Sequence, residues 1–255
     1  MKGRRVVITG IGALTPVGAT ASEFWNGLVS GKSGVRPIEH FDTEGYTTKF
    51  AGQLEAYDPH DYFDRKEARR LDRMSQYGII AAQEAVTDSK LDLEAIDKDR
   101  VGVMIGSGIG GMQTYYEQSV GLSKYGQKGV SPFFIPMMIP DITAGRVAMI
   151  YGFRGPNFCA VSACATGSHN IGLAFDAIRY GTADYVVCGG SESSVWPIGV
   201  AGFASMKALS TRNDSPETAS RPFDKERDGF VIGEGSAIMM LEHLDSAVAR
   251  GARIY

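Results

Sequence analysis

Short apolar runs of strand length alternate with segments of helical periodicity along most of the chain, and this alternation limits the fold more than any other feature. The runs at 6–9, 100–105, 184–189 and 236–242 are almost continuously apolar. Strands that are apolar on both faces are typical of sheets covered by helices on both sides, and such sheets are mostly parallel. The pattern therefore predicts a layered α/β fold with a mostly parallel central sheet.

Helix signals fall between these runs. A Thr-x-x-Glu capping box at Thr20 and Glu23 predicts that a helix begins there. Apolar residues at helical spacing predict a long helix over 74–86 and further helices over 112–124 and 141–151. Strands that alternate with helices in this way favour one continuous α/β unit.

Cys164 stands where an apolar, β-prone run at 157–161 gives way to a helical pattern that continues to Tyr180 and closes at Gly181. A cysteine at such a strand-to-helix turn lies near unpaired N–H groups and the positive end of the helix dipole. Both stabilise the thiolate, which is the nucleophilic form. Small neighbours such as Ala163 leave room for a substrate carbonyl. A buried structural cysteine is the alternative, since free cysteines are among the most buried residue types.

The other two cysteines, Cys159 and Cys188, lie inside apolar runs and are interpreted as small core residues. Three widely spaced cysteines do not make a disulfide framework, and no Cys-x-x-Cys pair indicates a metal site. We therefore expect no metal, no cofactor and a reducing, cytoplasmic compartment. No apolar run approaches the roughly 18 residues that span a bilayer. The net charge of −3 gives no reason to expect nucleic acid or an anionic membrane as a partner.

Two further patterns have a weaker link to chemistry. The stretch from Gly106 to Gly111 matches the dinucleotide-binding fingerprint, but the acidic residue that should follow about 20 positions later is missing. It is interpreted as a tight, ligand-facing turn. The four histidines form no pair at catalytic or metal spacing. His169 follows Cys164 by five positions and is rotated away from it on the helix, so a structural role is favoured.

A dense basic patch, in a chain that is otherwise acidic, precedes the long helix. It consists of Arg65, Lys66, Arg69, Arg70 and Arg73. A run of charge is most often a solvated surface, and an acidic partner is the alternative.

Six motifs, taken in order, resemble the β-ketoacyl-acyl-carrier-protein synthases of the condensing-enzyme (thiolase-like) superfamily, and most of all the synthase II type. They begin at Arg5, Gly106, Ser131, Ser162, Ala208 and Arg221. The resemblance runs over all 255 residues. It implies a thiolase-like layered α-β-α fold in which residues 1–255 form the first of two pseudo-symmetric halves, with a mostly parallel mixed sheet.

The resemblance implies a reaction as well. An acyl group passes from a carrier-protein thioester to the sulfur of Cys164. Malonyl-acyl-carrier protein then binds and loses CO2, and the resulting carbanion attacks the acyl-enzyme, which elongates a fatty acid by two carbons. The implied partners are acyl-carrier protein, malonyl-acyl-carrier protein and a second copy in a homodimer.

Individual positions carry over from the resemblance. It assigns an acyl pocket and its surroundings to Ile109, Phe134, Ala163, Gly199, Phe203 and Phe230. Phe134 is expected to reach the pocket across the dimer interface, and Phe230 to lie near the nucleophile. For each of them ordinary core packing is the alternative. Lys66, Arg69 and Arg70 match the basic face on which the acidic carrier protein docks.

Family members also carry two active-site histidines and a lysine in a second half that the sequence up to Tyr255 lacks. We therefore expect this chain to be part of a larger synthase and not to complete the condensation alone. Two alternatives stay open. One is a non-catalytic ketosynthase-like partner of the chain-length-factor type, although such partners lack the cysteine that is present here as Cys164. The other is an acyl-carrying half-protein.

Overall fold

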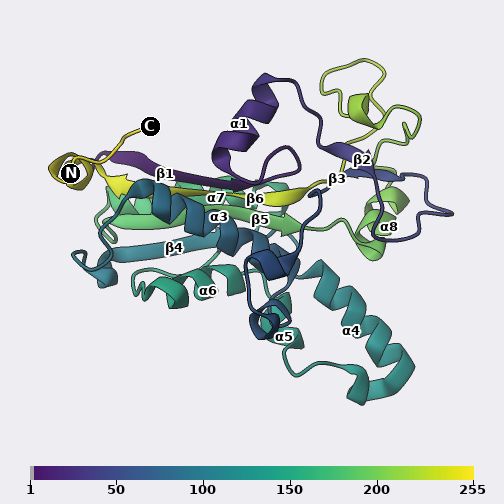
Figure 1. Ribbon diagram of the computed structural model, residues 1–255, viewed down its shortest axis with the longest axis horizontal. Coiled ribbons are helices and arrows are strands. Elements are labelled where there is room, and N and C mark those ends of the chain that lie inside the picture. The colour runs from purple at the N-terminus through teal and green to yellow at the C-terminus, as the bar shows by residue number, and fades with distance from the viewer. Residues whose placement is uncertain (1–2) are drawn as a thin grey trace.

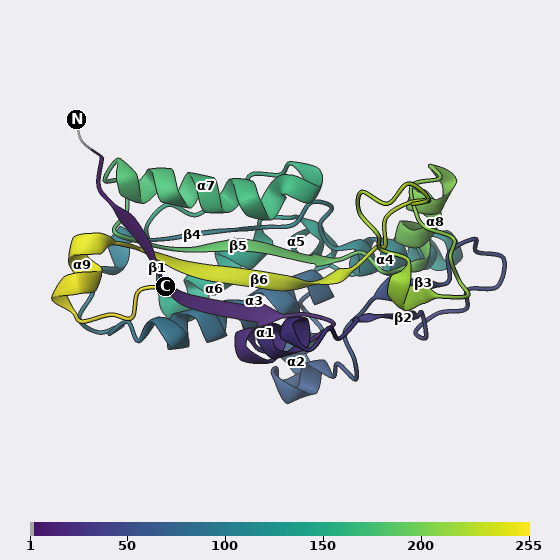
Figure 2. The ribbon, with the colours of Figure 1, turned by 90° about the horizontal axis from the view of Figure 1, so that it is seen from above.

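One four-stranded sheet forms the middle layer of the molecule, and helices lie on both its faces (Figure 1). The structure, a computed structural model, describes residues 3–255. The strand order is β1 (Val6–Leu14), β6 (Glu234–His243), β5 (Tyr185–Ser193) and β4 (Val101–Gly106). Figure 2, which looks along the sheet, shows α7 on one side and α3 and α6 on the other. The predicted α/β layered fold is confirmed.

The sheet is mixed and mostly parallel in direction, as expected: β1, β5 and β4 run the same way, and β6 runs against them. Strand β6 pairs antiparallel with both β1 and β5, so among hydrogen-bonded neighbours only β4 and β5 pair in parallel. The apolar composition of these strands reflects burial on both faces, which the two helical layers provide whatever the direction of the strands. The reversed direction of β6 could therefore not be predicted from composition alone.

Helices α3 (Arg73–Ser89) and α6 (Ile142–Tyr151) cover one face of the sheet. Val103, Val187 and Met240 belong to the hydrophobic cluster on this side, together with small residues of α3. The buried residues of α3 recur along 17 residues at helical spacing, which confirms the predicted long helix.

Helix α7 (Thr166–Arg179) covers the opposite face. Met104 and Cys188, which alternate with the strand residues of the first cluster, pack here against Ala174 and Ile178. The helix ends as predicted: Tyr180 is its C-cap and Gly181 follows at φ +83°. The buried stripe of this helix is narrow, and Phe175 is 37% exposed.

Strand β1 meets α3 at very short range, and two glycines make this possible. A Cβ atom at Gly12 would lie 2.0 Å from the carbonyl oxygen of Ala81, and one at Gly10 would lie 2.1 Å from that of Ala85. Any side chain at either position would collide with the helix backbone. The glycines therefore set the distance between β1 and α3.

Two carboxylates of α3 also bind the backbone of β1. Glu84 accepts hydrogen bonds from the N–H of Ala13 at 2.8 Å and of Ala21 at 2.9 Å. Asp88 accepts one from the N–H of Ile11 at 3.0 Å. These bonds fix the strand along the helix in addition to the packing of the glycines.

The remaining elements surround this body. Thr20 caps the predicted first helix and accepts a hydrogen bond from the N–H of Glu23 at 3.2 Å. The other helices and strands are α1 (Ala21–Val29), β2 (Val35–Pro37), β3 (Phe50–Gly52), α2 (Arg65–Ala68), α4 (Met112–Tyr125), α5 (Phe134–Met138), α8 (Pro197–Ser205) and α9 (Leu244–Ala249). Within residues 3–255, no helix has the length and apolar character that a membrane span needs.

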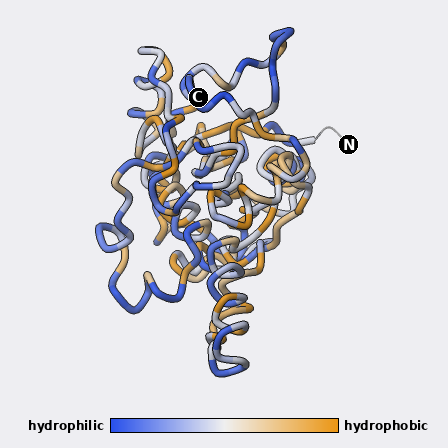
Figure 3. Tube along the Cα trace, turned by 90° about the vertical axis from the view of Figure 1, so that its right-hand side faces the viewer, coloured by the Kyte–Doolittle hydropathy of each residue, from blue (hydrophilic) through white to orange (hydrophobic). Residues whose placement is uncertain are grey.

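Helix α4 projects away from the sheet (Figure 1). Apolar and polar residues alternate along the protruding segment (Figure 3). Of its 14 residues only Thr114 is buried, while Tyr115, Leu122 and Tyr125 are exposed. This arm thus carries apolar side chains far from the core described above.

Candidate active site

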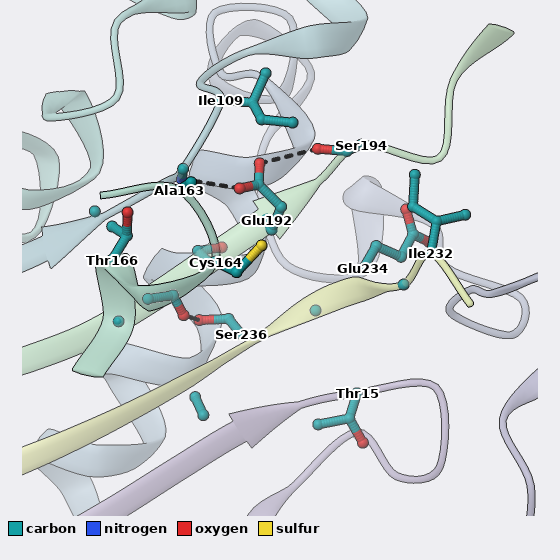
Figure 4. A pocket seen from close by; sticks show the side chains of 18 of the residues that line it. Thr15, Ile109, Ala163, Cys164, Thr166, Glu192, Ser194, Ile232, Glu234 and Ser236 are labelled. Carbon is teal, nitrogen blue, oxygen red and sulfur yellow. Dashed lines mark hydrogen bonds between the residues drawn. The ribbon is translucent and has the colours of Figure 1, made fainter. Parts of the chain in front are cut away.

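Cys164 lies in a short 3-10 turn, Ala163–Ala165, directly before α7, and is exposed. Its side chain lines a cavity of about 610 Å³ (Figure 4). The predicted helix therefore begins next to Cys164, and its first turn lies at the cavity. The alternative of a buried structural cysteine is wrong for this residue.

The predicted strand at 157–161 is wrong, because the segment pairs with β4 at one isolated bridge only. A side chain replaces the missing strand partner. The amide of Asn170 on α7 accepts a hydrogen bond from the N–H of Ala160 at 2.9 Å and donates one to its carbonyl at 3.0 Å. The hydroxyl of Thr166 accepts another from the N–H of Ser162 at 2.9 Å. Helix α7 thereby holds the chain that leads to the cysteine.

Ala163, immediately before Cys164, adopts φ +51°. Residues other than glycine occupy this left-handed region only when the surrounding structure holds them there. The reversal ends the extended approach and turns the chain into α7. The backbone at the cysteine is therefore a strained elbow.

The cavity forms where β4, β5 and β1 end and β6 begins, so four strands bring their loops to one end of the sheet (Figure 4). The turn after β4 contributes Gly106, Gly108 and Ile109, and Gly110 in the same turn has φ +91°. The glycine-rich stretch is thus a tight turn that faces the cavity, as predicted.

Four of the predicted pocket residues meet at this cavity with Cys164: Ile109, Ala163, Phe203 and Phe230. The rings of Phe203 and Phe230 contact each other edge to face, with their centroids 5.3 Å apart. They form an apolar part of the cavity wall. The structure thus places these residues together, while their role in binding stays a prediction.

Gly199 and Phe134 are absent from the cavity wall formed by residues 3–255. Gly199 is buried in α8, where an added Cβ would lie 2.3 Å from the carbonyl oxygen of Ser194. Phe134 lies on α5, half-buried. Within one chain, Gly199 affects the cavity wall through its close contact with Ser194, which lines the cavity. The contribution of Phe134 across a dimer stays a prediction.

Sequence reasoning missed two carboxyl groups that line the cavity. Glu192 accepts hydrogen bonds from Ser107 Oγ at 2.8 Å, the N–H of Gly108 at 2.9 Å and Ser194 Oγ at 3.1 Å. Burial raises its pKa. Glu234 is buried and accepts a hydrogen bond from the N–H of Leu54 at 3.0 Å. The signal that could have revealed both is a glutamate at one end of an apolar strand, near the last residue of β5 for Glu192 and at the first residue of β6 for Glu234.

The other cysteines differ from Cys164. Burial raises the pKa of the Cys188 thiol, which is completely buried in β5, as predicted. Burial, and then the nearby charge of Asp141, raise the pKa of Cys159, which is only half-buried. A raised pKa keeps a thiol protonated and poorly nucleophilic. The exposed cysteine at the cavity is therefore the one suited to react.

His169 fits its predicted structural role in that its ring is hydrogen-bonded, but it is exposed. Its Nδ1 lies 2.5 Å from Ser162 Oγ.

The basic patch lies on and after the short helix α2. Lys66, Arg69 and Arg70 are exposed, and none of them belongs to an ion pair among residues 3–255. Glu67, which lies between them, is bound instead by Arg146 at 2.7 Å. The guanidinium of Arg70 lies 4.6 Å from the centroid of the Phe133 ring, and a docking role of the three cations stays a prediction.

Comparisons with known proteins agree with this fold and site. The family model described as "Beta-ketoacyl synthase, N-terminal domain" matches residues 3–247. The chain is 48% identical to a 3-oxoacyl-[acyl-carrier-protein] synthase 2 of Synechocystis over 252 residues. It is 49% identical to a protein of the same name from Vibrio cholerae over 255 residues. The two matches span 99% and 100% of this chain but only 61% and 62% of the relatives' own length.

Solved structures show the same fold. A β-ketoacyl synthase from Burkholderia phymatum superimposes with a TM-score of 0.88 at 34% identity, over 98% of this chain and 62% of that one. A type II polyketide acyl-carrier protein in complex with its ketosynthase gives a TM-score of 0.85 at 32% identity, over 99% and 61%. The fold and the cysteine turn define a thiolase-like ketosynthase domain. The chain belongs to the β-ketoacyl synthase family, of which it matches the N-terminal domain.

Proposed function

We propose that the protein to which this chain belongs is a 3-oxoacyl-[acyl-carrier-protein] synthase that elongates fatty acids by two carbons. Cys164 accepts the acyl group as a thioester with release of the carrier thiol. Decarboxylation of malonyl-acyl-carrier protein then supplies the carbanion that attacks this thioester and releases the sulfur. The 48% and 49% identity to two synthases of this name supports the reaction.

The observation that carries the proposal is the position of Cys164, exposed at the start of α7 and in the wall of an apolar cavity. Thioester exchange needs a group that is both a good nucleophile and a good leaving group, and a thiolate is both. The N–H groups of Ala165 and Thr166 are hydrogen-bonded to the carbonyl oxygens of Ser162 and Ala163, so the stabilisation of the tetrahedral oxyanion is assigned to the N–H of Cys164. Ile109, Phe203 and Phe230 supply the apolar surface for the acyl chain.

The test is the location of the acyl group. After treatment of the complete synthase with acyl-acyl-carrier protein or a cerulenin-type inhibitor, mass spectrometry should find the adduct on Cys164. Cys164→Ala should lose the adduct and lower kcat/KM on the order of 10⁴-fold or more, as is typical when a nucleophile is removed. An adduct on Cys159 or Cys188 would refute the proposal.

We also propose that Lys66, Arg69 and Arg70 dock the acidic carrier protein. Each exposed charge pair contributes only about 0.2–1 kcal/mol and is screened by salt. Replacing all three by Glu should raise KM for carrier-bound substrate strongly, while activity on a small pantetheine thioester should barely change. In the wild type, KM for the carrier should rise steeply with salt. Equal loss on both substrates would make the patch structural.

The homodimer is part of the proposal. The exposed Tyr115, Leu122 and Tyr125 on the protruding α4 support it, because such side chains are seldom left in water over a wide area. Analytical ultracentrifugation of the complete synthase should show a dimer, and a monomer at working concentration would contradict this. The cytoplasmic compartment stays a prediction.

A second candidate is a non-catalytic partner of the chain-length-factor type, since the chain is 30% identical to the ishigamide ketosynthase/chain length factor, with a TM-score of 0.87. The exposed Cys164 favours the enzyme. The prediction that residues 1–255 alone do not complete condensation would be contradicted by 3-ketoacyl product from the purified chain. An acyl-carrying role would instead show as a stable thioester that malonyl-acyl-carrier protein never consumes.

A further inference from the structure

A carboxyl group without a cation partner stands beside the nucleophile, and the proposed reaction gives it no part. Glu192 lies near the end of β5 and lines the same cavity as Cys164 (Figure 4). It belongs to no ion pair in the described part of the chain. Its three donors are two serine hydroxyls and the N–H of Gly108. A charge that costs energy to bury, and that no cation offsets, needs a reason to be there.

The contacts of Gly108 supply that reason. A Cβ atom on Gly108 would lie 2.7 Å from the carbonyl oxygen of Ala163 and 3.2 Å from Glu192 Oε2. The glycine backbone is thus packed between the carboxyl group and the residue that precedes the nucleophile. On its other side, Ala163 holds φ +51°, a conformation that costs on the order of 1–3 kcal/mol unless its surroundings impose it.

We propose that Glu192 is a positioning residue for Cys164. Its carboxyl group fixes the N–H of Gly108, Gly108 supports the carbonyl of Ala163, and the strained turn then directs the sulfur into the cavity. The inference rests on the proposed function in that Cys164 is taken as the reacting group. The donors also explain why an acceptor side chain stands here. The backbone N–H of Gly108 can only donate, so its partner must accept, whereas the serine hydroxyls can donate or accept.

The test compares Glu192→Gln with Glu192→Ala in the complete synthase. The Gln carbonyl can accept from Gly108 while its NH2 donates to the serine hydroxyls, which rotate to accept. Ala leaves the N–H of Gly108 without a partner. The readout is the rate at which iodoacetamide alkylates Cys164, located by mass spectrometry and followed as a function of pH. Glu192→Ala should slow alkylation by about 10- to 100-fold through misplacement of the sulfur.

Glu192→Gln should react at close to the wild-type rate with an unchanged pH profile. Ser194→Ala is the matched control, because it removes a donor to Glu192 without touching the contact with Gly108. Equal slowing in the Gln and Ala variants, or a shifted pH profile in Gln, would show that charge and not position matters, and would overturn the proposal. A wild-type rate in Glu192→Ala would overturn it too.

If Glu192→Ala fails to fold, Gly108→Ala decides, because it keeps the carboxyl group but drives a methyl group between that group and the Ala163 carbonyl, at 3.2 Å and 2.7 Å from their oxygens. Slowed alkylation then supports the positioning role, and a wild-type rate refutes it. Failure of the proposed function would give a different experimental result. In that case wild-type Cys164 takes no acyl group from the carrier, although iodoacetamide still reports its placement.

Discussion

Helices α3 and α7, which cover opposite faces of the sheet, differ in how deeply they are buried. In α3, 11 of 17 residues are buried, and the helix backbone touches the glycines of β1. In α7, only four of 14 residues are buried, and Leu173 and Phe175 are 38% and 37% exposed. Helix α3 completes the core, whereas α7 uses a narrow stripe to hold its first turn at the cavity. Changes on α3 should therefore cost stability, and changes at the start of α7 should cost chemistry.

The largest expected effect on stability lies within α7 itself. Ile178→Ala should lower the free energy of unfolding by about 2–5 kcal/mol, because the side chain is fully buried and leaves a cavity. Leu173→Ala, on the exposed side of the same helix, should cost less than about 1 kcal/mol. Urea denaturation of both variants measures the difference. Similar losses would show that the stripe is as wide as that of α3.

A pair of glycine variants sharpens the contrast between the two faces. Gly12→Ala places a methyl group 2.0 Å from the Ala81 carbonyl oxygen and should cost about 1–3 kcal/mol or more. Gly172→Ala on α7 meets no atom within 4 Å and should stabilise the helix by roughly 0.5–1 kcal/mol. Thermal midpoints should move in opposite directions. A fall in both would mean that α7 is packed as tightly as the seam between α3 and β1.

The smallest effect concerns Asp228, in the loop that precedes β6. Hydrogen bonds from Ser210 Oγ and the N–H of Thr211 lower the pKa of Asp228 from 3.8 to about 2. A depressed folded-state pKa stabilises the protein above the unfolded value, and this contribution is lost as the pH falls from 3.8 through about 2. Asp228→Asn should remove that part of the pH dependence.

Unfolding free energies of wild type and Asp228→Asn, measured across this pH window, should converge at its acid end. Because Asp228 is exposed, the difference above the window should be small. Parallel curves would show that the carboxyl group does not titrate with unfolding.

What the sequence could predict was local. The cap at Thr20, the end of α7 at Gly181 and the stripe of α3 depend on residues a few positions apart, and all were found. What it could not predict depends on distant partners. The direction of β6 is set by its neighbours in the sheet, and Asn170 replaces a strand at 157–161.

The candidate site divides in the same way. The position of Cys164 followed from a local turn, but its cavity joins loops from four strands. Glu192 escaped notice because its donors, Ser107 and Gly108, lie 85 and 84 positions away along the chain. The basic patch was visible as a run, but the pairing of Glu67 with the distant Arg146 and not with a cation of the patch was not.

The hydrogen bonds between the backbone of β1 and the carboxylates of α3 affect how the protein behaves in solution. Glu84 and Asp88 occupy the N–H groups of Ala13 and Ile11. A strand whose donors are already taken offers a poor template to a foreign strand, and edge-to-edge pairing is a common first step of aggregation. Helix α3 thus protects this edge of the sheet. A foreign strand that added to β1 would first have to displace α3.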